Sequence, residues 1–191
     1  MTDDLVFRRP TEADHATVVR SVDEWWGGRR LRHLLPRLWF QHFAGTSWLA
    51  QTGRDGKIVG FLVGFRSQER PDEAYVHMIG TSPNRRRSGL GAELYRRFGD
   101  DMRERGARRM VAITWPGNRV SVMFHRALGF VPQAGPGSQS LFGVVAYPDY
   151  DDEREDRVVF VRELWPVVAE PDRIERCMTI IRSPRSTGAR R

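Results

Sequence analysis

The chain has 191 residues, a mass of 22.1 kDa, a formal net charge of +7 and a pI near 10.6. This length allows one substantial hydrophobic core and is short for two domains. The single cysteine, Cys177, excludes an internal disulfide and favours a cytoplasmic location. No stretch is long and apolar enough to cross a membrane, and the N-terminus lacks the basic start and apolar run of a signal peptide.

The positive charge lies largely at the C-terminal end. The last ten residues hold four arginines and no acidic residue, and without them the excess falls to about +3. Net charge therefore gives little support to nucleic-acid binding. We expect a domain at 1–165 followed by an extension at 166–191 with a basic, disordered tail, and residues 165–181 fit either an extra helix or an arm of a homodimer.

In chain order, the first half predicts a strand, two helices and a β-hairpin. Their expected bounds are Leu5 to Arg9 for the strand, Thr11 to Val22 and Leu31 to Phe43 for the helices, and Trp48 to Gln51 with Lys57 to Phe65 for the hairpin. The hairpin turn contains Asp55-Gly56, which is a strong turn signal.

The centre of the chain predicts a strand, an anion-binding loop and a helix. Tyr75 to Thr81 has the pattern of a strand, and apolar residues at helical spacing run from Leu90 until Gly106 ends the helix. The loop between them is Ser82-Pro83-Asn84-Arg85-Arg86-Arg87-Ser88-Gly89. A phosphate is favoured at a helix N-terminus by the exposed backbone N–H groups and by the positive end of the helix dipole. Glycines there also bring no side chain that would hold the phosphate away from the backbone.

The second half predicts three further strands and a helix. Their expected bounds are Arg109 to Trp115, Leu141 to Ala146 and Arg157 to Leu164 for the strands, and Asn118 to Gly129 for the helix. We expect the apolar stripe of this helix to comprise Val120, Phe124, Ala127 and Leu128. No histidine or cysteine spacing predicts a metal site.

Two motifs resemble those of the GNAT superfamily of N-acetyltransferases. The first is Arg86-x-x-Gly89-x-Gly91 after Thr81-Ser82-Pro83, and the second is Asn118-x-x-Ser121-x-x-Phe124-His125-x-x-Leu128-Gly129-Phe130. A Rossmann fingerprint would need a glycine where Leu94 stands, and a P-loop would need a lysine, whereas the only lysine is Lys57. The resemblance covers roughly Leu5 to Leu164 and implies an α/β fold, with a mixed central sheet of about seven strands flanked by about four helices.

The resemblance implies acetyl-CoA as co-substrate, without a metal. Six consecutive backbone groups would bind the diphosphate, those of Arg87, Ser88, Gly89, Leu90, Gly91 and Ala92, and the side chains of Arg86 and Arg87 would add charge. The backbone of Ile79 and Thr81 would pair with the pantetheine arm, and an N–H there would stabilise the oxyanion. Asn118 would contact the arm, cap its helix, or do both.

The resemblance also implies direct transfer to an amine within a ternary complex. His125 stands where the family commonly has a tyrosine that protonates the departing thiolate, so it is the candidate general acid, or else a surface histidine. The family's strand glutamate is replaced here by Ile113 and Thr114. The candidate bases are therefore His77, which a core position would also explain, and Glu24, with Glu73 and Asp23 also open.

Two segments are candidates for the acceptor site. Trp25 and Trp26 would form aromatic walls for a cationic amine or would simply fill the edge of the core. The acidic run at 149–156 would attract an amine or would only be solvated. The acceptor, a small molecule or a protein N-terminus, is not identified. Two other classes of function stay open, a non-catalytic acetyl-CoA sensor or scaffold and a module that binds nucleic acid or another acidic partner.

Overall fold

The computed structural model describes residues 4–26 and 31–164. The expected extension at 166–191, the segment 165–181 and Cys177 lie outside the described residues. Within the described residues, no helix is long and apolar enough to span a membrane.

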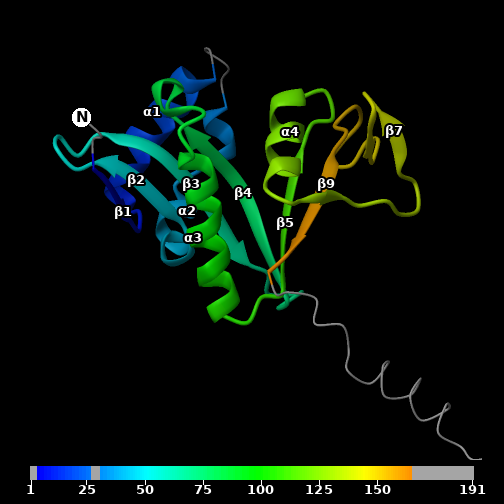
Figure 1. Cartoon of the computed structure of the whole chain (residues 1–191), viewed down its shortest axis with the longest axis horizontal. Coiled ribbons are helices and arrows are strands. Elements are labelled where there is room, and N and C mark those ends of the chain that lie inside the picture. Colours follow the sequence, from blue (N-terminus) through cyan, green and yellow to red (C-terminus); the bar gives the residue numbers. More distant parts are fainter. Residues whose placement is uncertain (1–3, 27–30, 165–191) are drawn as a thin grey trace, which may run out of the picture.

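A mixed sheet of seven strands forms the centre of the fold (Figure 1). Its strands lie in the order β1-β2-β3-β4-β5-β9-β6. Neighbouring strands are antiparallel except β4 and β5, which are parallel. The bounds are β1 Leu5–Arg8, β2 Trp48–Thr52, β3 Ile58–Arg66, β4 Glu73–Thr81, β5 Arg109–Thr114, β9 Val158–Glu163 and β6 Val131–Pro132.

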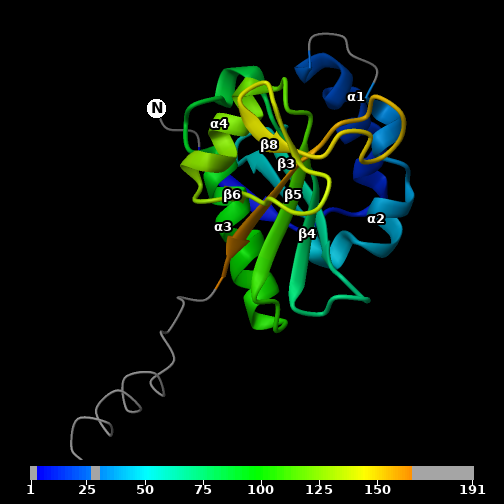
Figure 2. The same ribbon diagram turned by 90° about the vertical axis from the view of Figure 1, so that its right-hand side faces the viewer.

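Helices cover both faces of this sheet (Figure 2). Their bounds are α1 His15–Trp25, α2 Leu38–His42, α3 Leu90–Glu104 and α4 Arg119–Ala127. Helices α1 and α2 pack on one face around the buried Phe61, while α3 and α4 pack on the other around Phe98 and Phe160. The predicted mixed sheet with helices on both faces is confirmed.

The second predicted helix was too long. Instead of one helix from Leu31 to Phe43, the structure has a 3-10 turn at Arg32–Leu34 and the short α2 at Leu38–His42. Pro36 explains the interruption, because it has no N–H to donate and restricts the residue before it, Leu35, to non-helical backbone.

The predicted strand from Leu141 to Ala146 was wrong. The segment forms a separate two-stranded hairpin, β7 Gln139–Leu141 and β8 Val144–Ala146, and β6 takes the edge of the main sheet. Phe142 and Gly143 both have positive φ, of 52° and 79°, which is typical of a two-residue hairpin turn.

The predicted apolar stripe of α4 was also wrong in part. Val120 is 81% exposed and Ala127 is exposed, whereas Val122 and His125 are buried and Phe124 and Leu128 are partly buried. The helix therefore presents a face rotated from the predicted one, and His125 lies within the core instead of on its flank.

Candidate active site

The segment from the end of β4 to the first turn of α3, Ser82 to Gly91, has backbone suited to an anion. We call it the glycine loop. Arg87 and Gly89 have φ of 60° and 84°, in the left-handed region, and α3 begins at Leu90. Left-handed residues in a turn direct neighbouring N–H groups toward one side, and the N-terminus of α3 adds its dipole. The loop thus combines two features that favour a phosphate.

The two glycines of this loop serve different purposes. Gly89 supplies a left-handed backbone and faces open space, since a Cβ there would meet nothing within 4 Å. Gly91 has an ordinary helical backbone, but a Cβ there would lie 2.9 Å from Cζ of Phe124 on α4. Gly89 therefore keeps the loop surface clear, and Gly91 allows α3 and α4 to approach each other closely.

Strands β4 and β5 separate before they reach the glycine loop. Their parallel pairing runs from Glu73 with Arg109 to Val76 with Ala112 and then stops, although β4 continues to Thr81 and β5 to Thr114 (Figure 1). The separation starts at a bulge, because His77 has no partner on β3 while Val76 and Met78 do. A bulge increases local twist and turns a strand away from its neighbour.

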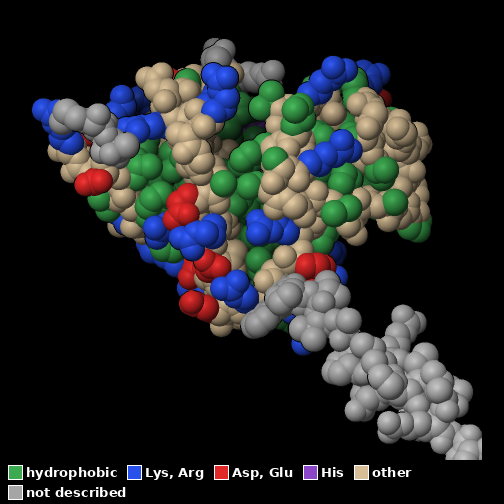
Figure 3. Space-filling model, in the orientation of Figure 1, with side chains coloured by type: hydrophobic (Ala, Val, Ile, Leu, Met, Phe, Trp, Pro, Cys, Tyr) green, Lys and Arg blue, Asp and Glu red, His purple; other side chains and the backbone are tan. Residues whose placement is uncertain are grey.

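The separated half of β4 contains two predicted site residues, Ile79 and Thr81. Both pair with β3 on one side, and no described strand pairs with them on the side facing β5. In the space-filling view, hydrophobic side chains line the hollow beside α4, and basic side chains lie at its upper rim (Figure 3). This opening leads to the glycine loop, so the structure brings these predicted residues together.

Asn118 begins α4 next to the end of β5. Its Oδ1 accepts a hydrogen bond from the Ser121 N–H at 3.1 Å, so the predicted helix cap is confirmed. A contact with a pantetheine arm stays a prediction.

His125 is buried, with 4% of its surface exposed. Nδ1 lies 2.8 Å from the carbonyl of Ser121, which can only accept, so Nδ1 carries the hydrogen. Nε2 then accepts from the Tyr95 hydroxyl at 2.8 Å, and the ring stacks on Phe160 at 5.0 Å. Burial lowers the pKa of His125, and the backbone bond to Ser121 offsets this in part.

This arrangement favours a neutral ring that joins α3, α4 and β9. The role of general acid stays a prediction, but it needs a protonated ring with a free path to a thiolate, and both nitrogens already have partners. Sequence reasoning missed Tyr95 because nothing in its spacing shows that its hydroxyl meets a histidine on another helix.

His77 lies on the opposite face of the sheet, toward α1 and α2. Nε2 lies 2.7 Å from the carbonyl of Leu34, and the ring stacks on Trp39 with centroids 4.2 Å apart. Since the carbonyl only accepts, Nε2 carries the hydrogen and Nδ1 keeps its lone pair. Burial lowers the pKa of His77, so its ring is neutral at neutral pH. A neutral imidazole with a lone pair is the state that a base requires.

These two histidines predict an acid-sensitive fold. Histidine in the unfolded chain takes up a proton near pH 6.5. In the folded protein the pKa values of His77 and His125 are lowered, so their rings take up a proton only at a lower pH. The free energy of unfolding should therefore fall as pH drops below about 6.5, by at most ~1.4 kcal/mol per pH unit for each ring. Urea unfolding between pH 7.5 and 5 measures this, and a flat profile would contradict it.

Of the carboxylates at the end of α1, Glu24 is exposed and Asp23 is held in place. Asp23 accepts from the Leu31 N–H at 3.2 Å and from Arg32 Nε at 2.8 Å. The guanidinium of Arg32 lowers the pKa of Asp23, which stays ionised. Asp23 thus connects α1 to the segment that follows, and Glu24 is the better placed of the two to meet a ligand.

Trp25 is the last residue of α1, and Trp26 is its C-cap. Trp25 is buried and stacks on Phe61 at 6.0 Å, whereas Trp26 is half-buried. Arg86 donates from Nη2 to the carbonyl of Trp25 at 2.5 Å, so part of its guanidinium is directed to α1. A contribution of Arg86 to the positive charge at the mouth of the glycine loop stays a prediction.

The acidic run at 149–156 connects β8 to β9 on the α1 and α2 side of the sheet (Figure 2). Arg157 pairs with Asp151 at 2.8 Å and with Glu155 at 2.5 Å, so the run is partly neutralised. The pKa of Tyr75 on β4 is raised to about 12, mainly by burial and then by Tyr150 and Asp151. The run therefore lies close enough to β4 for its charge to act there.

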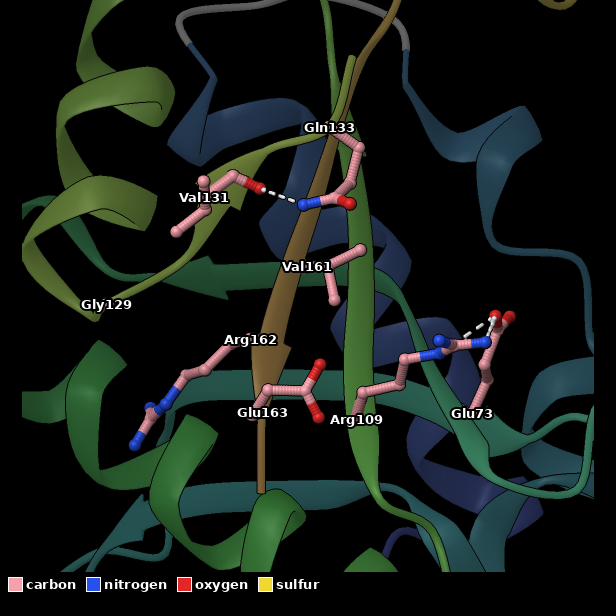
Figure 4. A pocket seen from close by; sticks show the side chains of 8 residues that line it. All are labelled: Glu73, Arg109, Gly129, Val131, Gln133, Val161, Arg162 and Glu163. Carbon is pink, nitrogen blue, oxygen red and sulfur yellow. Dashed lines mark hydrogen bonds and ion pairs between the residues drawn. The ribbon is translucent and has the colours of Figure 1, made fainter. Parts of the chain in front are cut away.

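A pocket of about 680 Å³ lies elsewhere, at the start of β4 and β5 (Figure 4). Arg109 and Glu73 pair within it at 2.8 Å, and Glu163 and Val161 of β9 also line it. Because the glycine loop follows the other end of β4, this pocket is not part of the candidate site.

Within the described residues, no group of His, Cys, Asp and Glu is placed to hold a metal ion.

Comparison with known proteins gives consistent results. The model of the acetyltransferase (GNAT) family matches residues 15–130. The L-2,4-diaminobutyric acid acetyltransferase of Nocardia farcinica is 30% identical over 112 residues, which are 59% of this chain and 57% of that protein. Its counterpart in Streptomyces coelicolor is 29% identical over 119 residues, 62% of this chain and 69% of that protein. The match thus spans little more than half of the Nocardia protein.

Solved structures share the fold. Ard1 from Thermoplasma volcanium has a TM-score of 0.67 at 19% identity, covering 85% of this chain and 99% of its own. Diaminobutyrate acetyltransferase EctA from Paenibacillus lautus, solved with L-2,4-diaminobutyric acid and coenzyme A, has a TM-score of 0.61 at 19% identity, covering 86% and 98%. The family model matches more than half of the residues of this chain, its mixed sheet opens between β4 and β5, and the glycine loop lies at that opening. This chain therefore belongs to the GNAT acetyltransferase family.

Proposed function

We propose that the chain transfers an acetyl group from acetyl-CoA directly to a primary amine of a small cationic acceptor, in a ternary complex. The observation that carries this proposal is the opening between β4 and β5, which ends at the glycine loop. An extended thioester arm fits an opening lined by strand backbone, and a diphosphate fits a helix N-terminus.

The backbone supplies the cofactor contacts in this proposal. N–H groups of residues 87–92 hold the diphosphate, and the free edge of β4 at Ile79 and Thr81 pairs with the pantetheine arm. An N–H group of the same edge stabilises the oxyanion of the tetrahedral intermediate, a contribution typically worth about 3 to 4 kcal/mol. In this proposal the acetyl donor is bound mainly by backbone groups, so the side chains of the site are free to select the acceptor.

The amine must lose a proton before it attacks. His77 is our candidate base, because its Nε2 is committed to the Leu34 carbonyl and Nδ1 keeps a lone pair. Glu24, exposed at the end of α1, is the second candidate. The collapsed intermediate releases CoA, whose thiolate takes its proton from His125 or from solvent.

The acceptor class is inferred from two sources. The matched relatives are named for L-2,4-diaminobutyric acid, which carries two amines. The acidic run also places negative charge near β4, which attracts a cation at low ionic strength. We therefore propose a small diamino acid as the acceptor.

An amine panel tests the function. The full chain would be incubated with acetyl-CoA and L-2,4-diaminobutyrate, spermidine or an N-terminal peptide, with thiol release followed and products identified by mass spectrometry. We expect mono-acetylated diaminobutyrate as the fastest product. CoA binding without thiol release on any amine would instead support a sensor or scaffold.

The role of His77 predicts a large rate effect. His77→Gln keeps a donor for the Leu34 carbonyl but removes the base, so kcat should fall about 100-fold, within the range typical of general-base loss. His15→Gln is the matched control, since His15 Nε2 contacts the Leu35 carbonyl at 3.0 Å and its ring packs on Phe40. Equal kcat values in the two variants would exclude His77 as the base.

A further inference from the structure

Arg86, the second arginine of the glycine loop, contacts the end of a distant helix. Arg86 Nη2 donates to the carbonyl of Trp25 at 2.5 Å, across 61 residues of sequence. Trp25 is the last residue of α1, where carbonyls lack helical partners and the helix dipole is negative. A guanidinium satisfies both needs, since it donates a charge-assisted hydrogen bond and brings positive charge.

The end of α1 also rests on the separated half of β4. A Cβ at Gly80 would lie 2.6 Å from Trp26 Cη2 and 2.6 Å from Phe61 Cε1, so the two rings leave no room for a side chain. Gly80 pairs with Phe61 across β3 and β4, between Ile79 and Thr81. The end of α1 thus contacts the strand segment proposed to hold the pantetheine arm.

The same turn of α1 carries Glu24, the second candidate base of the proposed function. Asp23 holds Leu31 and Arg32, and Glu24 is exposed beside it. One helical turn therefore carries both the Trp25 carbonyl that Arg86 contacts and Glu24, a candidate base in the proposed function.

We propose that Arg86 is a positioning residue that ties the acceptor side of the site to the glycine loop, so that cofactor binding and acceptor binding are coupled. This inference rests on the proposed function. A diphosphate on the loop backbone fixes Arg86, and Arg86 in turn fixes the Trp25 carbonyl and the last turn of α1. Coupling of this kind is reciprocal, so an acceptor that orders α1 also strengthens CoA binding.

Hydrogen–deuterium exchange of the full chain tests the coupling without an acceptor. We expect CoA to slow exchange both in Ser82–Gly91 and in Val18–Trp26 of the wild type. In Arg86→Ala the first protection should remain and the second should disappear, and Arg86→Lys should restore part of it. Arg105→Ala is the matched control, because Arg105 Nη2 donates to the Gly45 carbonyl at 3.1 Å, and it should behave as wild type.

Kinetics give a second readout that a merely structural role would not produce. Arg86→Ala should raise the KM for the amine about tenfold, equivalent to about 1.4 kcal/mol, with the Kd for CoA changed less than about threefold. Protection of Val18–Trp26 by CoA in Arg86→Ala, or a CoA Kd that changes as much as the amine KM, would overturn the inference. Absence of protection at Ser82–Gly91 in the wild type would instead overturn the proposed function, and the coupling with it.

Discussion

Gly89→Glu is expected to weaken acetyl-CoA binding about 100-fold or more. The new carboxylate would project from the glycine loop into the space proposed for the diphosphate, where nothing of the protein lies within 4 Å of a Cβ. Two like charges about 4 Å apart near a protein surface repel by about 4 kcal/mol, and each tenfold loss of affinity needs only about 1.4 kcal/mol. Calorimetric titration with acetyl-CoA measures the loss.

Gly129→Glu is the matched control for this substitution. Gly129 has φ of 81°, close to the 84° of Gly89, and a Cβ there also meets nothing within 4 Å. Both variants should lose about 1–2 kcal/mol of stability from the left-handed backbone. Gly129 follows α4 at its other end, so its variant should bind acetyl-CoA as the wild type does. Equal binding losses in both variants would show that the glycine loop is not the diphosphate site.

His125→Phe is expected to destabilise the fold by about 2 kcal/mol. The ring of the new phenylalanine can still stack on Phe160. The buried Tyr95 hydroxyl, however, would lose its hydrogen-bond partner, and an unsatisfied buried donor costs about 1–3 kcal/mol. Tyr95→Phe in the same chain removes that donor, so the double variant should regain about 1–2 kcal/mol. Urea unfolding of the wild type, both single variants and the double variant measures the coupling.

The same double variant tests His125 as the general acid. Loss of a general acid typically lowers the rate 100-fold or more. Because the stability is largely restored, kcat should stay within about threefold of wild type if His125 only joins α3, α4 and β9, which is the result we expect. A 100-fold loss of kcat in the stable double variant would show that the buried ring donates a proton after all.

The sequence predicted the fold well where local patterns determine it. Apolar periodicity and turn residues located the hairpin of β2 and β3, the strand β4 and the helix α3. The glycine loop was also predictable, because its glycines and its place between a strand and a helix are both local features. These elements position the backbone of the site, and the local features alone predicted an anion there. Acetyl-CoA was predicted from the resemblance of two motifs to those of a known family.

The sequence predicted less where two distant segments decide the outcome. The bulge at His77 and the separation of β4 from β5 depend on strand register, which periodicity does not give. The partners of His77 and His125, namely Leu34, Trp39 and Tyr95, come from other elements. Val120 shows the same limit, because an apolar residue at helical spacing is buried only if another element covers it, and here none of the described elements does.

Initial rates on a grid of acetyl-CoA and amine concentrations test the central claim most directly. Direct transfer in a ternary complex predicts amine-dependent thiol release with double-reciprocal lines that intersect. Parallel lines, typical of a covalent acetyl-enzyme, or thiol release that does not depend on the amine would contradict it.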